Sequence, residues 1–266
     1  METKEYLKQL KSCKNEQEFK NIWNTDKFNW IGHSNFLCQY CHKYFKIWWN
    51  SDKFNWVYYS DYLCQYCHKY FKIWWNNKKF NWYYSNFLCQ YCSKYFKIWW
   101  DPDKFNYDYI NNLYKYCNQY FKIWWDFKHL DYDDSICFLL CRYCNQYFKI
   151  WWDSEKFDWG NQSSNLCIYC SEYFKIWWNP EKFVWYWNFA YLASCCSEYF
   201  DIWWDSEKID WRHYSKYLCK YCSNYFNIWW DSEKFNWDYA DYLQKYCSKY
   251  KHIWEKDYIK WKLKNI

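Results

Sequence analysis

The chain has 266 residues and a mild net charge of +6 that is unevenly placed: residues 1–125 hold 18 Lys and 10 acidic residues (+8), and the remainder 18 basic and 20 acidic residues (−2). Aromatic residues make up 31% of the chain and Gly and Pro number two each, which excludes collagen-like and Gly- or Pro-rich disordered chains and argues against folds built on tight β-turns. No segment approaches the ~20 apolar residues of a membrane span, and no apolar secretory signal opens the chain, so we expect a cytoplasmic, reducing location.

One sequence motif recurs ten times, and an isoleucine marks each copy. The markers are spaced by 25 to 27 residues: Ile22, Ile47, Ile73, Ile98, Ile123, Ile150, Ile176, Ile202, Ile228 and Ile253. A fixed period of this length indicates stacked repeats. We therefore predict an all-α fold, an α-solenoid of ten short helical hairpins forming a single elongated domain over residues 1–266.

Residues 1–30 are predicted to be an N-terminal capping unit, 31–248 core repeats and 249–266 a C-terminal cap. Aligned on Ile22, the first unit places Cys13 at the first Cys of other copies and Phe19 at their Tyr, and it has one Trp where they have two. The last unit is shortened in the same way at Trp254. Terminal repeats that lose core aromatic residues and gain charge are typical of caps.

Each core unit is predicted to begin with a helix of about four turns, as in 60–75. Leu63, Cys67, Tyr70 and Trp74 recur with helical period and form an apolar stripe. A serine at the start of five units is expected to cap this helix: Ser34, Ser60, Ser85, Ser163 and Ser215.

A second start signal follows the Trp pair, as in 153–157. This signal is Asp or Asn as the N-cap, Pro or Ser at the first helical position and an acidic residue in the first turn. It predicts a short second helix that includes Phe157 and Trp159. The unit length varies after this point, which predicts a connecting loop there. A partner is expected to be recognised at one of two sets of positions. The first is the variable positions on the polar strip of the first helix, such as Gln65, Lys115, Arg142, Ile168 and Lys220, and the second is these loops, around Tyr83, Tyr109, Asp133, Gln162 and Trp187. A β-solenoid is disfavoured because Gly is nearly absent and the apolar residues do not alternate.

A unit such as Tyr169–Phe183 (YCSEYFKIWWNPEKF) resembles the tandem aromatic, Cys-containing repeats of uncharacterised proteins from giant amoeba-infecting viruses of the mimivirus type. The excess of Asn, Lys, Tyr, Ile and Phe suits the AT-rich genome of such a virus. The resemblance implies a viral origin, with the protein in the host cytoplasm or the virion. It assigns no functional residue.

Cysteines occur as i, i+3 pairs in six units: Cys38/Cys41, Cys64/Cys67, Cys89/Cys92, Cys141/Cys144, Cys167/Cys170 and Cys219/Cys222. Any two pairs from adjacent units would supply four thiolates for Zn²⁺. The candidate ligands are the first three pairs, taken two at a time. Core packing is the favoured interpretation, because Tyr114, Ala193 or Gln244 replaces the first Cys in other units while the helix pattern continues. A redox or disulfide role is a third interpretation. We expect no metal and no cofactor.

A row of lysines occupies one register in six consecutive units: Lys46, Lys72, Lys97, Lys122, Lys149 and Lys175. Stacked hairpins would arrange them as a positive ladder suited to a polyanion such as nucleic acid. The favoured interpretation is that these lysines complement the helix dipole and keep the surface polar.

No Ser, Cys or His stands in a setting of its own, so we expect no catalytic residue and no enzyme. The sequence thus predicts a non-enzymatic repeat scaffold for protein–protein interaction or structural assembly, with another protein as partner. Polyanion binding through the Lys row and zinc binding by the paired Cys are the alternatives.

Overall fold

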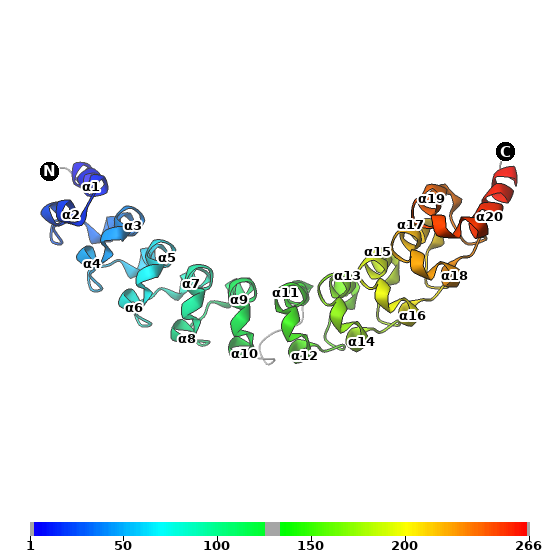
Figure 1. Ribbon diagram of the computed structural model, residues 1–266. Helices are drawn as coiled ribbons and strands as arrows, with labels where there is room; N and C mark the ends of the chain where they lie inside the picture. Colours follow the sequence, from blue (N-terminus) through cyan, green and yellow to red (C-terminus); the bar gives the residue numbers. More distant parts are fainter. Residues whose placement is uncertain (1–2, 126–133, 265–266) are drawn as a thin grey trace. The chain divides into compact units, whose positions relative to one another are not determined.

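The computed structural model describes residues 3–125 and 134–264, and within these ranges the only regular secondary structure is helical. The chain divides into two compact units, Met1–Trp125 and Asp126–Ile266, each of which contains five pairs of helices among its described residues. In each unit the long helices form one layer and most of the short helices the other, and each pair packs on the next (Figure 1). This arrangement confirms the predicted all-α solenoid class.

The first unit contains ten helices in its described residues: α1 (Thr3–Ser12), α2 (Glu16–Ile22), α3 (Trp30–Cys41), α4 (Phe45–Trp48), α5 (Trp56–Cys67), α6 (Phe71–Trp74), α7 (Ser85–Cys92), α8 (Phe96–Trp99), α9 (Ile110–Tyr116) and α10 (Phe121–Trp124). The described part of the second unit contains α11 (Asp134–Cys144), α12 (Phe148–Trp151), α13 (Trp159–Tyr169), α14 (Phe174–Trp177), α15 (Trp185–Cys195), α16 (Phe200–Trp203), α17 (Trp211–Tyr221), α18 (Phe226–Trp229), α19 (Ala240–Tyr246) and α20 (Lys251–Lys264).

The predicted four-turn helix is wrong in its boundaries, because it is broken at the second cysteine. In the unit containing 60–75, α5 ends at Cys67, whose backbone has φ −113° and ψ 16°, and a short 3₁₀ turn leads into α6. The Cys67 carbonyl at this break is buried, and the indole N–H of Trp74 donates to it at 2.9 Å. A buried carbonyl must find a donor. The same indole bond recurs in the other units from Trp48 to Trp254.

The predicted second helix is a single turn. Its start signal is chemically correct, since Asp153 Oδ1 accepts from the backbone N–H of Glu155 at 3.0 Å. The turn closes when Phe157 N–H donates to Asp153 O at 3.0 Å, and the chain then leaves it. Trp159 begins the next long helix, which Asp158 caps by accepting from Asn161 N–H at 3.2 Å. The hairpin is therefore a long helix, a 3₁₀ turn, a one-turn helix and a connecting turn.

In the units that begin at Trp56 and Trp82, the difference in length lies in the first turn of the long helix rather than in a loop. That turn is part of the α-helix where the unit begins at Trp56, and a separate 3₁₀ turn, Trp82–Tyr84, where one residue fewer is present. Tyr83, Tyr109, Gln162 and Trp187 accordingly lie in or near these first turns and not in loops; Asp133 lies outside the described residues.

The serines predicted as caps lie inside the long helices and join neighbouring units. Ser60 is buried, its hydroxyl donates to Trp56 O at 2.5 Å, and it accepts from Asn81 N–H of the next unit at 3.1 Å. Asparagine or aspartate takes the capping role instead, as Asn81 does for Tyr83 N–H at 3.1 Å. The equivalent inter-unit bond is made to Ser34, Ser85, Ser163 and Ser215.

Within each of the two compact units, a column built from stacks of three rings joins the short helices. Phe71 stacks on Trp75 of its own unit with centroids 5.2 Å apart, and on Tyr95 of the next unit with centroids 4.5 Å apart. Each stacked pair contributes about 0.5–1.5 kcal/mol beyond area burial. The inter-unit stack recurs at Phe45–Tyr70, Phe96–Tyr120, Phe148–Tyr173, Phe174–Tyr199, Phe200–Tyr225 and Phe226–Tyr250.

The N-terminal unit is displaced from the predicted alignment. Phe19 stacks on Tyr44 with centroids 4.5 Å apart, as Phe45 stacks on Tyr70, so it replaces the Phe and not the Tyr of other units. Leu10 takes the first-Cys position, since its carbonyl lies 4.0 Å from Cys41 Sγ. Cys13, three residues further along the chain, therefore takes the second-Cys position. The alignment on Ile22 misplaced these residues because Ile22 stands where other units have the first Trp, and because two more residues separate Leu10 from Phe19 than separate Cys64 from Phe71.

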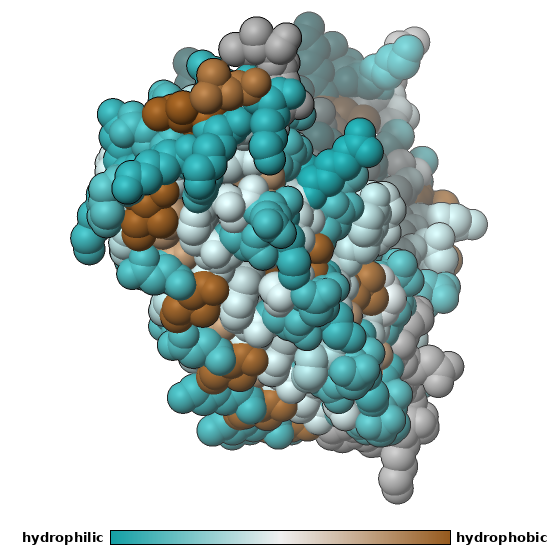
Figure 2. All heavy atoms as spheres, turned by 90° about the vertical axis from the view of Figure 1, so that its right-hand side faces the viewer, coloured by the Kyte–Doolittle hydropathy of each residue, from teal (hydrophilic) through white to brown (hydrophobic). Residues whose placement is uncertain are grey.

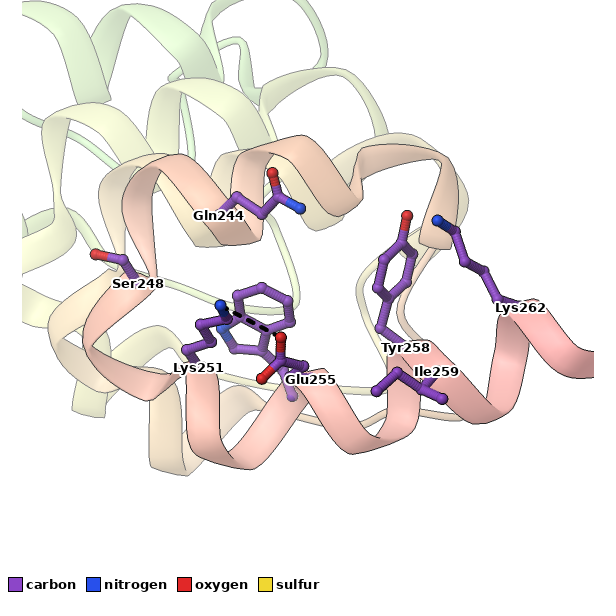
Figure 3. A pocket seen from close by; sticks show the side chains of 8 residues that line it. Gln244, Ser248, Lys251, Glu255, Tyr258, Ile259 and Lys262 are labelled. Atoms are coloured by element: carbon purple, nitrogen blue, oxygen red, sulfur yellow. Dashed lines mark ion pairs between the residues drawn. The ribbon is translucent and has the colours of Figure 1, made fainter.

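The C-terminal unit replaces a ring pair with an ion pair. Lys251 follows Tyr250 where Phe226 follows Tyr225, and its ammonium lies 3.3 Å from the Glu255 carboxylate at the position of a ring stack in other units. A cavity of about 550 Å³ lies beside this pair, between α19 and α20 (Figure 3). It is lined by Gln244, Ser248, Lys251, Trp254, Glu255, Tyr258, Ile259 and Lys262. Charge thus covers the end of the stack where a further aromatic unit would pack.

Candidate functional site

The predicted lysine row lies on the short helices, in α4, α6, α8 and α10 of the first unit and in α12 and α14 of the second. All six lysines, Lys46, Lys72, Lys97, Lys122, Lys149 and Lys175, are exposed. Within each unit the ring column holds successive short helices side by side, so the structure brings the first four lysines together on one surface and the last two on another.

A row of exposed isoleucines runs beside the lysines. In α6, Phe71 and Trp74 are buried because residues i and i+3 share one face of a helix, which turns Lys72 and Ile73 outward. The isoleucine side chain is about half exposed at Ile73 (51%), Ile98 (53%) and Ile123 (49%), and similarly at Ile176, Ile202 and Ile228. We call the exposed row made by Lys46, Ile47, Lys72, Ile73, Lys97, Ile98, Lys122 and Ile123 the Lys–Ile face.

Sequence reasoning missed the isoleucines because it used them only as repeat markers. The sequence pattern that indicates their exposure is Phe-Lys-Ile-Trp. When such a stretch forms one helical turn that buries the Phe and the Trp, the Lys and the Ile between them face outward. Figure 2 shows apolar side chains recurring at intervals along the molecule between polar ones. Large apolar residues exposed in a regular row are typical of interaction surfaces.

The lysines of this face are not neutralised locally. Among the described residues, no carboxylate lies within 4.0 Å of the ammonium groups of Lys46, Lys72 or Lys97. One turn earlier, Lys43, Lys69 and Lys94 add further positive charge in the first unit. In the second unit the same register holds Gln146, Glu172, Glu198, Asn224 and Lys249, so this register carries less positive charge there than in the first unit.

Several lysines of the connecting turns behave differently, because each of them pairs with an acid of the preceding repeat: Lys53, Lys79, Lys182, Lys208 and Lys234. Lys79 lies 2.6 Å from Asp52, and this pair lowers the pKa of the Asp52 carboxyl. Lys182 and Glu155 form the same 2.6 Å pair in the second unit. These lysines fasten one turn to the next and are not free to bind an external anion.

The paired cysteines lie in the core. All twelve are buried, and burial raises the pKa of the Cys41 and Cys222 thiols to about 12. No group of three or more His, Cys, Asp or Glu side chains that would hold a metal ion occurs in the part of the chain that the structure describes. The first-Cys and second-Cys thiols of neighbouring units do meet in pairs.

Trp187 is the most exposed tryptophan of the protein. It lies in α15 with 72% of its surface accessible, and Tyr186 (50%) and Tyr191 (44%) are exposed on the same helix. The sequence singled this position out as one where a partner would be recognised, and the structure places it on the surface.

Comparisons with protein-family models, with curated proteins and with solved structures give no match for this chain. Among the described helices, none is both long enough and apolar enough to cross a bilayer.

Proposed function

We propose that the protein is a non-enzymatic repeat scaffold that binds an acidic, apolar segment of a protein partner along the Lys–Ile face of its first unit. The observation that carries the proposal is the row of half-exposed isoleucines, Ile73, Ile98 and Ile123, beside lysines that have no acidic partner in the described part of the chain. An isoleucine adds little to binding a phosphate backbone, whereas a protein segment with alternating acidic and apolar side chains complements both rows.

The expected gain from each isoleucine follows from its remaining exposed area. A side chain that is half exposed leaves roughly half of its apolar burial energy unused, which is about 1 kcal/mol per isoleucine on binding. Two isoleucines in adjacent short helices, such as Ile73 and Ile98, therefore account for tenfold or more in affinity. The lysines beside them add attraction that depends on salt and confer selectivity for an acidic segment.

Binding of two fluorescent probes to the full chain tests the proposal: a 20-residue peptide that alternates Glu and Leu, and a single-stranded oligonucleotide of 20 nucleotides. Ile73→Ser/Ile98→Ser is expected to weaken peptide binding about tenfold or more, and Lys72→Gln/Lys97→Gln to weaken it as well. Lys115→Gln, which removes an exposed charge of the first unit outside the Lys–Ile face, is the matched control and leaves binding unchanged.

The oligonucleotide arm tests the second candidate, polyanion binding, which the unpaired lysines favour. Oligonucleotide binding that depends steeply on salt, is lost in the lysine variant and is untouched by the isoleucine variant, with no peptide binding, replaces the scaffold proposal with that candidate. Circular dichroism melting of each variant establishes that the exposed substitutions leave the fold intact.

A further inference from the structure

The second cysteine of many units lies against the first cysteine of the unit before it. Cys117 Sγ is 3.9 Å from Cys89 O, and Cys247 Sγ is 3.8 Å from Cys219 O. In both cases the two thiols are also within hydrogen-bonding contact of each other. Six pairs of thiols from neighbouring units make this contact: Cys38–Cys67, Cys64–Cys92, Cys89–Cys117, Cys141–Cys170, Cys167–Cys196 and Cys219–Cys247.

The fold does not require two thiols at this place. Leu10 faces Cys41 and Ala193 faces Cys222, with the cysteine sulfur 4.0 Å from the facing carbonyl in both, which is nearly the same geometry as in the thiol pairs. An apolar side chain thus satisfies the packing. A second thiol is therefore not needed for packing. It does allow a disulfide to form between two neighbouring repeats.

We propose that the six inter-unit thiol pairs are oxidation sites, at which a peroxide converts neighbouring repeats into covalently joined ones. This inference does not depend on the proposed partner binding. One thiolate attacks a peroxide oxygen, the O–O bond breaks, and a sulfenic acid and water form. The second sulfur then attacks the sulfenic sulfur, the S–O bond breaks, and a second water leaves. Two thiols and one hydrogen peroxide give one disulfide and two waters.

Burial sets the rate of this reaction. It raises the pKa of the Cys64 and Cys89 thiols well above the ordinary value, so little thiolate exists while the interface is closed. The reaction therefore proceeds when two neighbouring repeats separate transiently, which occurs locally in stacked-repeat proteins. In a reducing solution the thiols stay reduced and packed in the core. Sustained exposure to peroxide forms disulfides between neighbouring repeats.

The test treats the reduced full chain with hydrogen peroxide, blocks the remaining thiols after denaturation, and maps disulfides by mass spectrometry of peptides. We expect the free thiols to fall from 18 to six, leaving Cys13, Cys41, Cys137, Cys144, Cys195 and Cys222. The oxidised chain should melt at a temperature roughly 5–10 °C higher, and a dithiol reductant should reverse the shift.

Two variants use the chain's own controls. Ala193→Cys places a thiol opposite Cys222 and is expected to add a seventh link, between the introduced thiol and Cys222. Cys219→Ala copies the natural Ala193 arrangement and is expected to leave Cys247 free; it tests the pairing whether or not the first variant folds. Links within one helix such as Cys64–Cys67, links without a pattern, oxidation to sulfonic acid without disulfides, or an unlinked Ala193→Cys chain would each overturn the proposal.

Discussion

Raising the pH is expected to unfold this protein through its buried thiols. Burial raises the pKa of ten of them above the ordinary value of 9.0, namely Cys13 and nine members of the i, i+3 pairs: Cys38, Cys41, Cys64, Cys89, Cys141, Cys144, Cys167, Cys219 and Cys222. A group whose pKa is raised by folding contributes stability that is fully present below its unfolded pKa and is lost as the pH rises above it. The loss should therefore begin near pH 9.

The magnitude follows from linkage. At pH 10 an unfolded thiol with a pKa of 9.0 is mostly ionised, which stabilises the unfolded chain by about 1.4 kcal/mol per thiol if the folded thiol stays protonated. Cys41 and Cys222, with pKa values of about 12, stay protonated at pH 10. The nine members of the i, i+3 pairs together give about 13 kcal/mol, as much as the whole stability of an ordinary domain.

Urea unfolding followed by circular dichroism at pH 8 and pH 10, with a phosphine reductant present, measures this loss. Tyrosine and lysine also titrate near pH 10, so the matched variant Cys64→Ala isolates one thiol. Its free energy of unfolding should fall by about 1.4 kcal/mol less than that of the unchanged protein between the two pH values. An equal fall in both proteins would refute the argument.

Three further outcomes are expected. Ser60→Ala removes the acceptor for the buried Asn81 N–H and should cost about 1–3 kcal/mol in urea unfolding, whereas Ser60→Thr, which keeps the hydroxyl, should cost less. The pair with Lys79 lowers the pKa of Asp52, so it adds stability above pH about 4, and that stability is lost as the pH falls through the folded pKa. Lys79→Met should remove this part of the pH dependence in thermal melts at acid pH. An unchanged pH dependence would contradict the argument. Lys251→Phe restores the ring that internal units have at this position, and sedimentation should then show more self-association than in the unchanged protein.

The period of the sequence predicted the stacked hairpins, but the pattern within one unit predicted the wrong helix boundaries. The stretch from Leu63 to Trp75 is apolar with helical period throughout, so nothing local indicates a break at Cys67. The break is stabilised from outside that turn, by the indole of Trp74 and by the stack of Phe71 on Tyr95 of the next unit. Tertiary contacts of this kind override the local pattern.

The candidate site was predicted in part. The lysine register was visible because charge repeats at one position, and the buried cysteines followed from their replacement by Tyr, Ala or Gln. The exposure of Ile73 was not predicted, because the isoleucines served only as repeat markers and the separate short helix that turns Ile73 outward was not predicted. The inter-unit thiol pairs were also beyond reach, since which sulfur faces which depends on how far one repeat is offset from the next.

The first turn of the long helix has a consequence for how such an array grows and shrinks as a gene. Where Trp56 begins the unit the turn is wound as α-helix, and where Trp82 begins it one residue fewer is wound as 3₁₀ helix, yet both units present the same Ser, Leu and Cys to their neighbours. Loss or gain of one codon there leaves the interfaces intact. Copies of unequal length can therefore be duplicated or exchanged by recombination without a matching change in the adjoining copy.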